Sequence, residues 1–375
     1  MHVLVVTCAH RGDDARIVHR EIRSLLEHDH QVTLIAPDPG EDGRRQDPAG
    51  LERYVIPRAE GRQRLRSWRA ARRAARRFAR VVDAAIVHDP ELLVPLGIGR
   101  WHGATLVWDV HEDFVASVSD RRWIPGPVRP VVRAIVSLLE TFARRRYRIV
   151  LAEDSYCDRF AGAPVVPNST WVLDDPTPLD TSDPRVVYVG RLSRGRGVAA
   201  LVSVGEELVR RGGPRLVLVG PADADTEPIV RDAVTRGAVE WRGPLPNPAA
   251  MELVRGAVAG LSLLGNHPNY VHSRPTKIVE YMAHGVPAIA TPLPLASQMI
   301  VQSGAGVATQ HWFGPELVNE VADAVVAYVS SPAMRGAHGV GGWQYVRDNL
   351  SWNSDGARFV GLIELWVADQ LRLSS

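Results

Sequence analysis

The 375 residues of the chain are many for one hydrophobic core and suit two domains of ordinary size. Hydrophobic residues make up 45% and charged residues 23%, a composition that excludes an intrinsically disordered chain. No apolar run reaches the ~18 residues of a membrane span, and a net charge of +2 names no partner by itself.

A first series of apolar segments predicts an α/β domain at residues 1–168. Residues 2–8 form a continuous apolar run, which is typical of a parallel strand covered on both faces. A helix at 17–27 and a strand at 31–37 follow, and this order predicts a doubly wound sheet. No GxGxxG motif follows the first strand, so the dinucleotide-binding fingerprint is missing. Further strands are expected at 84–89, 105–110 and 148–153, with a helix at 128–145.

The segment 62–82 predicts a helix that is apolar along one side and basic on its other faces. The arginines on those faces are Arg64, Arg66, Arg69, Arg72, Arg73, Arg76, Arg77 and Arg80. A solvated helix is the simpler interpretation, and a surface for anionic lipid head groups or an acidic acceptor is the alternative. No recognised nucleic-acid module accompanies this helix, so we expect no nucleic-acid partner.

Polar side chains follow three of the expected strands: His88 with Asp89, Asp109 with His111, and residues 153–155. In open parallel sheets, ligands bind at the carboxyl ends of the strands, so we expect these residues to line a cleft. His88, Asp109, His111, Glu112 and Asp113 also suggest a metal site. Their spacing matches no standard ligand set, and we expect no metal.

The N-terminus and the cysteines predict a cytoplasmic protein. The opening MHVLVVTCAHRGDD is too short and too soon charged for a signal peptide. Cys8 and Cys157 lie far apart in the sequence, so no disulfide framework is expected and a reducing compartment fits. A peripheral place on the inner membrane face, held by the 62–82 helix, is the alternative.

Residues 169–184 are rich in Pro, Asp, Ser and Thr and are the best candidate for a linker. A second α/β series starts directly after it and predicts a second doubly wound domain at 185–345. Its strands are expected at 185–190, 215–220, 238–243, 257–264 and 286–291, with helices at 197–211, 226–236, 247–255 and 276–284. The later pattern is helical, with an interruption at 330–343. A final helix within 346–375 is expected to pack back on the first domain.

Lys277 is the only lysine among the 44 basic Lys and Arg residues of the chain. In so Arg-rich a chain, a compact ammonium is best explained where a planar guanidinium does not serve. The alternative is a lysine retained by chance. A polar turn precedes Lys277, and a helix, Gly285 and a buried strand follow, an order that presents helix N-terminal amides to a phosphate.

Four segments resemble the GT-B glycosyltransferases, and those of the second domain look like glycosyltransferase family 4. They are YVGRLSRGRG (188–197), NYVHSRPTKIVEYMAHGVPAIAT (269–291), DVHEDF (109–114) and HRGDDARIVHRE (10–21). The resemblance implies two Rossmann-like domains facing across a cleft: the first binds the acceptor and the second the donor. It also implies a retaining, metal-independent transfer from a nucleotide sugar.

The resemblance implies a diphosphate site in the second domain. Gly190, Arg191 and Arg196 lie in the Gly-rich turn that holds the donor diphosphate in the family, where Arg196 replaces the usual lysine. A subgroup with S-x-P-T-K before the helix resembles this chain better. In that subgroup Lys277 and the Thr276 amide lie by the phosphates.

The sugar side of the donor site departs from the family pattern. Glu280 matches the family glutamate that binds the donor ribose hydroxyls. His272 stands where a second glutamate contacts the transferred sugar, and Ser273 follows it. The departure leaves nucleotide binding intact and indicates an unusual or modified sugar.

In the first domain, the resemblance implies that His111 contacts the donor sugar and acts in catalysis together with Arg191 and Arg196. Asp14, Arg16 and Asp109 match the region of acceptor and phosphate contacts. A structural His111 held by Asp109 is the alternative.

Together these features predict a hexosyltransferase-like enzyme that moves a sugar from a nucleotide diphosphate sugar to a small-molecule or saccharide acceptor. No cofactor beyond this co-substrate is expected. A membrane lipid acceptor in envelope or polysaccharide synthesis is the alternative. A sugar-nucleotide epimerase and a non-catalytic nucleotide-binding subunit are alternatives of other classes.

Overall fold

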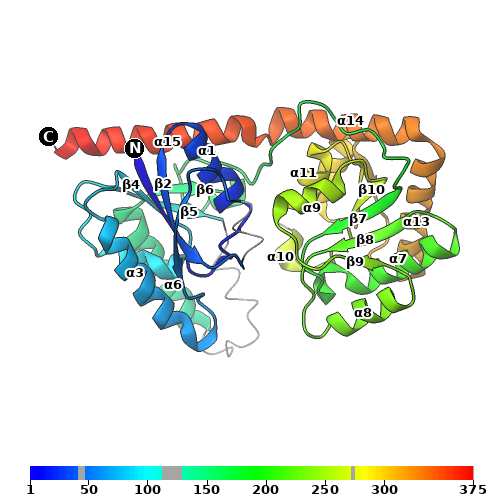
Figure 1. Cartoon of the computed structure of the whole chain (residues 1–375), viewed down its shortest axis with the longest axis horizontal. Coiled ribbons are helices and arrows are strands. Elements are labelled where there is room, and N and C mark those ends of the chain that lie inside the picture. Colours follow the sequence, from blue (N-terminus) through cyan, green and yellow to red (C-terminus); the bar gives the residue numbers. More distant parts are fainter. Residues whose placement is uncertain (41–46, 112–128, 272–274, 375) are drawn as a thin grey trace. The chain divides into compact units, whose positions relative to one another are not determined.

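The computed structural model describes residues 1–40, 47–111, 129–271 and 275–374. The chain divides into two compact units, each built on a six-stranded parallel sheet (Figure 1). The first unit comprises Met1–Asn168 with Ser354–Ser375, and the second comprises Ser169–Asn353. The segment 169–184, expected as a linker, groups with the second unit, where Thr170 forms a bridge with Ser351.

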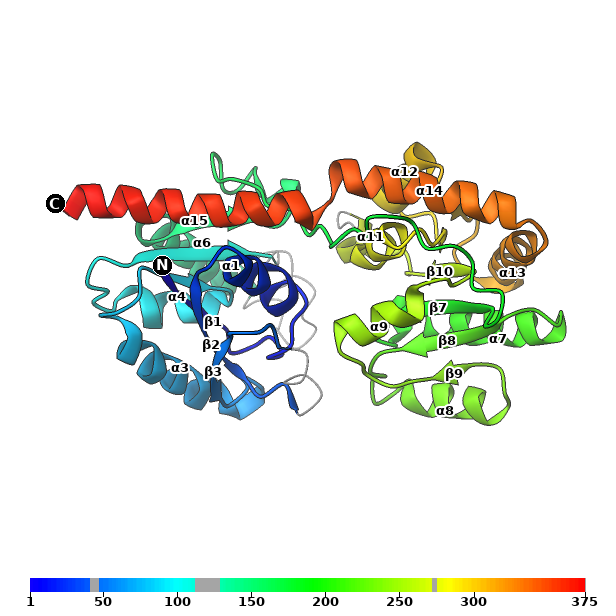
Figure 2. The ribbon, with the colours of Figure 1, turned by 45° about the horizontal axis from the view of Figure 1, so that its top comes forward.

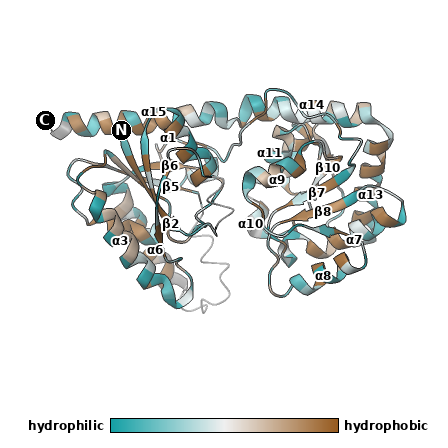
Figure 3. Cartoon of the chain, viewed as in Figure 1, coloured by the Kyte–Doolittle hydropathy of each residue, from teal (hydrophilic) through white to brown (hydrophobic). Residues whose placement is uncertain are grey.

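The sheet of the first unit has the strand order β3-β2-β1-β4-β5-β6. Its strands are β1 (His2–Val6), β2 (Gln31–Pro37), β3 (Glu52–Ile56), β4 (Ala84–Val87), β5 (Thr105–Val110) and β6 (Arg148–Leu151). The three central strands β1, β4 and β5 contain no exposed residue, as expected for strands covered on both faces. They are strongly hydrophobic, like the central strands of the second unit (Figure 3).

Helices cover this sheet on both faces. They are η1 (Ile17–Ile22), α1 (Arg23–Glu27), η2 (Gly61–Gln63), α3 (Arg64–Phe78), α4 (Pro90–Gly97), α6 (Arg129–Arg146), η4 (Asp154–Tyr156) and α15 (Trp352–Ser374). The final helix α15 runs alongside the first unit (Figure 2), where Thr105 Oγ1 donates to the Trp366 carbonyl at 3.2 Å. The expected return of the C-terminal helix to the first domain is therefore observed.

The sheet of the second unit has the order β12-β11-β10-β7-β8-β9. Its strands are β7 (Arg185–Val189), β8 (Arg215–Val219), β9 (Glu240–Trp241), β10 (Ala259–Ser262), β11 (Ala288–Ala290) and β12 (Gly306–Ala308). Its helices are η5 (Arg194–Arg196), α7 (Val198–Arg210), α8 (Glu227–Thr235), α9 (Asn247–Val254), α10 (Pro268–Val271), α11 (Thr276–Ala283), α12 (Pro294–Ser303), α13 (Gly314–Ser330) and α14 (Pro332–Asn349). The duplicated doubly wound architecture predicted from the sequence is thus present.

The predicted interruption at 330–343 is confirmed only at Ser331, between α13 and α14, and is wrong for 332–343, which lie in the continuous helix α14. Its glycines serve close packing instead of breaking the helix. A Cβ at Gly339 would lie 2.3 Å from the Gly285 carbonyl oxygen, and a Cβ at Gly342 would lie 2.9 Å from Met282. Small residues therefore let α14 approach α11 closely enough to pack against it.

Other differences concern short elements. The expected helix at 17–27 is a π-helix, η1, that continues as α1. β3, α4, α12 and β12 were not predicted, since each is short and carries little periodic signal. None of the described helices is long and apolar enough to cross a membrane.

Candidate functional site

The carboxyl end of β7 brings three predicted donor-site residues together. Gly190 follows the strand with φ +140°, a conformation that side chains rarely adopt, and its N–H donates to the Val219 carbonyl at 2.8 Å. A Cβ at this position would lie 3.3 Å from Lys277 Nζ and 3.5 Å from Arg196 Nη1. The glycine therefore leaves room for two cationic groups beside the backbone.

Lys277 lies in the first turn of α11 and is buried, with 7% of its surface exposed. Its Nζ has no hydrogen-bond partner among the described residues and lies 3.9 Å from the centroid of the Tyr188 ring. Burial, together with the positive charge of Arg196, lowers the pKa of Lys277 well below its ordinary value; Glu280 opposes this shift. A buried amine without an acceptor suits an anionic ligand.

The loop that carries Arg196 is fixed by backbone contacts. Gly197 follows η5 with a φ of +77°, and a Cβ at this position would lie 2.0 Å from the Leu263 carbonyl oxygen. The Gly265 N–H donates to the Gly195 carbonyl at 3.0 Å. These contacts tie the Gly-rich turn to the segment after β10, so the position of Arg196 is set by packed backbone.

Glu280 lies one turn of α11 after Lys277 and is buried. Its Oε1 accepts a hydrogen bond from Asn247 Nδ2 at 3.3 Å, which orients the carboxylate from α9. Thr276 is exposed at the start of the same helix, where the first amides have no acceptor within the helix. The first two turns of α11 thus carry backbone amides, the Lys277 amine and the Glu280 carboxylate.

Arg191 does not join this group. Its side chain is 59% exposed, and its Nη1 pairs with Asp223 Oδ1 at 2.6 Å. Arg194 is likewise exposed and pairs with Asp225. His272 and Ser273, also predicted for the donor site, lie outside the described residues.

In the first unit, Asp109 and Arg16 form a buried pair at the end of β5. Arg16 donates from Nε and Nη2 to the two carboxylate oxygens of Asp109, at 2.9 and 2.8 Å. Burial acts to raise the pKa of Asp109, but the charge of Arg16 and the hydrogen bonds outweigh it and hold that pKa well below its ordinary value. Asp14 accepts from the backbone N–H groups of Arg16 and Ile17 at the start of η1.

His111 is linked to Asp109 and to a second histidine. Its Nδ1 lies 3.0 Å from Asp109 Oδ2, and its Nε2 lies 2.9 Å from His10 Nε2. His10 Nε2 also lies 3.3 Å from Asp89 Oδ1. If Nδ1 of His111 carries its proton toward Asp109, Nε2 is the acceptor and His10 the donor. The row therefore connects two carboxylates through two imidazoles.

Glu21 and His88 lie next to the Arg16–Asp109 pair. Glu21 is fully buried within η1, with its Oε1 2.9 Å from Arg16 Nε and its Oε2 3.5 Å from His88 Nε2. Burial, followed by the negative charge of Asp109, raises the pKa of Glu21 well above its ordinary value. The charge of Arg16 is already neutralised by Asp109, so it does not reverse the shift. Burial also lowers the pKa of His88.

His88, Asp109 and His111 lie close enough to hold a metal ion, with ligand atoms within 4.8 Å of one another. Both oxygens of Asp109 already accept from Arg16, whose positive charge opposes a second cation. Nδ1 of each histidine is directed to the same carboxylate oxygen. We therefore describe these residues as a proton-sharing network and propose no metal site here.

Several residues of the two sites were not singled out from the sequence. They are His10, Glu21, Tyr188 and Asn247. His10 lies close behind the end of β1, so the rule that ligands bind at the carboxyl ends of strands, which selected Asp89 after β4, could have selected His10 as well. Tyr188 lies inside a strand and Glu21 inside a helix, where no local signal distinguishes them from core residues.

Comparisons with known proteins agree with this architecture. A family model described as Glycosyl transferases group 1 matches residues 183–331. The sucrose-phosphate synthase of Thermosynechococcus elongatus superposes with a TM-score of 0.68 at 15% identity, over 100% of both chains. HepE of Anabaena in complex with UDP-glucose gives 0.66 at 13% identity, over 97% of this chain and 99% of that one.

WaaG, a glycosyltransferase involved in lipopolysaccharide biosynthesis, gives a TM-score of 0.65 at 14% identity, over 97% of this chain and 99% of that one. A search of curated protein sequences gives no match. The structural likeness shows a GT-B fold, and the matched segment shows a group 1 glycosyl transferase domain in the second unit. The chain is an enzyme of the glycosyltransferase class.

Proposed function

We propose that the chain transfers a hexose-like sugar from a nucleotide diphosphate sugar to a small-molecule or saccharide acceptor, with retention at the anomeric carbon, as in glycosyltransferase family 4. The convergence of Gly190, Arg196 and Lys277 is the observation that carries the proposal. It leaves an amine and a guanidinium beside open backbone. A diphosphate supplies negative charge for both groups and an oxygen acceptor for Lys277 Nζ, which has none among the described residues.

The donor is held along α11 and the Gly-rich turn. Arg196, Lys277 and the first amides of α11 bind the diphosphate, and Glu280 accepts from the ribose hydroxyls. HepE has been solved with UDP and with UDP-glucose, and a uridine nucleotide is accordingly the first probe for this chain.

The chemical step needs charge stabilisation at the leaving group. As the bond from the anomeric carbon to the diphosphate oxygen breaks, negative charge grows on that oxygen, and Arg196 and Lys277 stabilise it. The acceptor hydroxyl forms the new bond on the same face of the sugar and passes its proton to the departing phosphate. No protein base is required for this step.

The first unit takes part in the transfer through the proton-sharing network that contains His111. We propose that His111 contacts the transferred sugar and that Asp14, Arg16 and Asp109 hold the loops that bind the acceptor. Because Arg16 and Asp109 are buried and paired with each other, their part is to fix the positions of η1 and β5. Because His272 stands where the family has a glutamate that contacts the transferred sugar, we propose that this sugar is unusual or modified.

Replacement of Arg196 tests this proposal, with Arg194 as the matched control. Arg194 lies in the same turn but is exposed and paired with Asp225, away from Gly190. We expect Arg196→Ala to lower kcat by ~100-fold or more, as for removal of a preorganised charge-stabilising donor. Arg194→Ala should stay within about threefold, and both variants should melt like the wild type. Equal kinetics for the two variants would remove Arg196 from the mechanism.

A product analysis with donor alone separates this function from epimerisation. A glycosyltransferase needs an acceptor other than water for efficient turnover, whereas an epimerase converts the nucleotide sugar without one. Rapid formation of an isomeric nucleotide sugar, with no free nucleoside diphosphate, would assign the chain to the epimerases.

A further inference from the structure

The helices α3, α4 and α6 of the first unit form one layer, and its outer side carries both exposed apolar side chains and exposed arginines. α4 packs between α3 and α6. Arg146 Nε donates to the Gly97 carbonyl at 2.8 Å and Tyr147 Oη donates to the Leu93 carbonyl at 2.7 Å, which fixes the end of α6 on α4. Gly97 permits this approach, because a Cβ there would lie 2.8 Å from the Phe142 ring. We call the outer side of this layer the α3–α4–α6 surface.

Large apolar side chains project from the α3–α4–α6 surface into solvent and are 41–71% exposed. They are Leu65, Val94, Ile98, Val131, Ile135 and Leu138. Val131, Ile135 and Leu138 follow one face of α6 at spacings of four and three residues, so they form a continuous stripe. Isolated exposed apolar residues are ordinary, but a stripe on one helix of a layer whose other helices also expose apolar side chains indicates an interaction surface.

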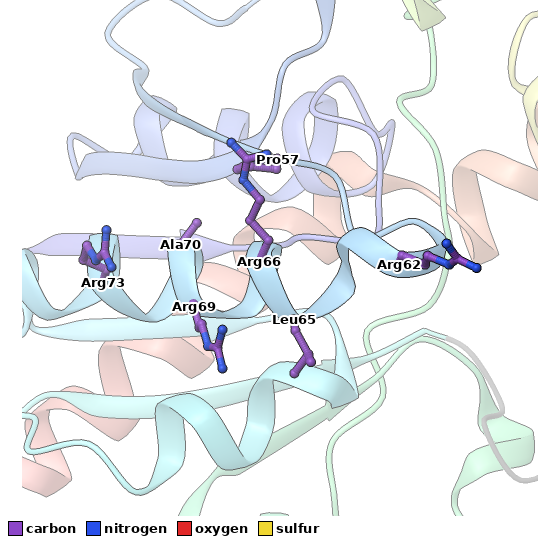
Figure 4. A pocket seen from close by; sticks show the side chains of 7 residues that line it. All are labelled: Pro57, Arg62, Leu65, Arg66, Arg69, Ala70 and Arg73. Atoms are coloured by element: carbon purple, nitrogen blue, oxygen red, sulfur yellow. The ribbon is translucent and has the colours of Figure 1, made fainter.

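Arginines without partners lie along α3 of the same layer, four of them around Leu65. Among the described residues, six exposed arginines that follow or lie within η2 and α3 make no ion pair, hydrogen bond or ring contact: Arg62, Arg66, Arg69, Arg73, Arg76 and Arg80. Arg64 and Arg77 differ, since they bind Glu91 and Tyr54. A hollow of about 560 Å³ on α3 is lined by Leu65 and four of the unpartnered arginines, with no carboxylate (Figure 4).

We propose that the α3–α4–α6 surface docks the chain on a bilayer that contains anionic lipids. The arginines match phosphate head groups in charge and in hydrogen-bonding geometry. The stripe on α6 and its apolar neighbours match the boundary between head groups and acyl chains. A single-stranded nucleic acid fits less well, because the exposed side chains that the structure describes on this surface include no aromatic ring for base stacking. For a glycosyltransferase, docking at this surface would place the acceptor at the same membrane. Only this consequence rests on the proposed function.

Co-sedimentation of the full chain with vesicles tests the docking surface. Vesicles of phosphatidylcholine with about one third phosphatidylglycerol are compared with pure phosphatidylcholine vesicles. We expect the wild type to pellet with the anionic vesicles at low salt and to be released progressively as salt is added. The triple variant Arg66→Glu, Arg69→Glu, Arg73→Glu should lose at least ~10-fold in partitioning. The double variant Ile135→Ser, Leu138→Ser should lose about threefold or more, including at intermediate salt.

Matched controls in the second unit separate the surface from net charge and general hydrophobicity. Arg210→Glu, Arg231→Glu, Arg236→Glu makes the same charge change from the same net +2, and Val209→Ser, Val301→Ser removes two exposed apolar side chains. Both controls should pellet like the wild type. The proposal is overturned if the wild type stays in the supernatant, if it pellets equally with both vesicles, or if the controls lose as much as the surface variants.

The nucleotide-binding test keeps the two proposals separate. Binding of UDP should be the same for the wild type and all four variants. Vesicle binding without any nucleotide binding would overturn the proposed function and support the docking surface. Nucleotide binding without vesicle binding would support the proposed function and overturn the docking surface.

Discussion

At the scale of single residues, the lone lysine is the informative position. The sequence singled out Lys277 because it is unique and precedes a helix, and the structure adds that its amine is buried beside Arg196 without a hydrogen-bond partner among the described residues. No sequence pattern could have shown that the ring of Tyr188 lies under that amine, since the contact depends on how β7 and α11 pack.

The lowered pKa of Lys277 predicts that nucleotide binding takes up a proton. In the ligand-free chain the amine gives up its proton at a pH below its ordinary value of 10.5. A diphosphate restores the charged form, so at a pH between the lowered pKa and 10.5 the bound state holds more protons than the free state. UDP titrations in buffers of different ionisation enthalpy should show this as a positive slope of the measured enthalpy. Lys277→Met should bind more weakly, by about tenfold or more, and lose the slope.

A zero slope for the wild type at every pH from about 8 to about 10, where the nucleotide phosphates are themselves fully ionised, would contradict this account of Lys277. Arg210→Met, an exposed arginine on α7, is the control and should leave both affinity and slope unchanged.

The second residue-scale prediction concerns Glu21. Its folded-state pKa is raised above the ordinary value of 4.5, so the stabilising protonated form is lost as pH rises through the folded value. Stability should therefore fall with rising pH between about 5 and the raised pKa, by up to ~1.4 kcal/mol per pH unit. Glu21→Gln, which cannot ionise, should be flatter than the wild type in urea unfolding at pH 5 to 8.

Other groups titrate between pH 5 and 8. The test therefore compares the free energy of unfolding of the wild type with that of Glu21→Gln at each pH. His111 has a raised pKa and adds a loss in the same direction, whereas His88 and His19 have lowered values and add a gain up to their ordinary 6.5. Parallel curves for wild type and Glu21→Gln would mean that Glu21 is ionised in the folded chain.

At the scale of elements, the long buried strands were predicted well and the packing glycines were not. Parallel strands covered on both faces appear as unbroken apolar runs, and this made β1, β2, β7 and β8 visible in the sequence. The part of α14 at 332–343 was missed because Gly339 and Gly342 look like breakers until their close neighbours are known. The π-helical turn of η1 carries the buried Glu21, which pairs with Arg16, and no local pattern in the sequence indicates this geometry.

The turn after β7 gives an element-scale prediction. Gly190→Ala places a methyl group 3.3 Å from Lys277 Nζ on a backbone at φ +140°. We expect a loss of stability of about 1–3 kcal/mol and a loss of UDP affinity of at least ~10-fold, because the amine and the turn must both shift. Gly212→Ala is the control: its φ is +65° and its Cβ would meet nothing within 4 Å. That control should lose stability and keep UDP affinity; equal UDP affinity in both variants would contradict the assigned site.

At the scale of the whole molecule, the sequence predicted two doubly wound units, a C-terminal helix that packs on the first of them, and a glycosyltransferase. The structure, the fold comparisons and the matched group 1 domain agree with these statements at the level of class. The strand orders and the histidine network could not be predicted, because they arise from contacts between segments far apart in the chain.

The central claim is that the second unit binds a nucleoside diphosphate through Arg196 and Lys277. Isothermal calorimetry of the wild-type chain with UDP, GDP, ADP and dTDP tests it most directly. The account predicts saturable one-to-one binding of at least one of the four nucleotides, weakened at least ~10-fold in Arg196→Ala and unchanged in Arg194→Ala. Absence of binding for all four nucleotides by the folded protein would contradict it.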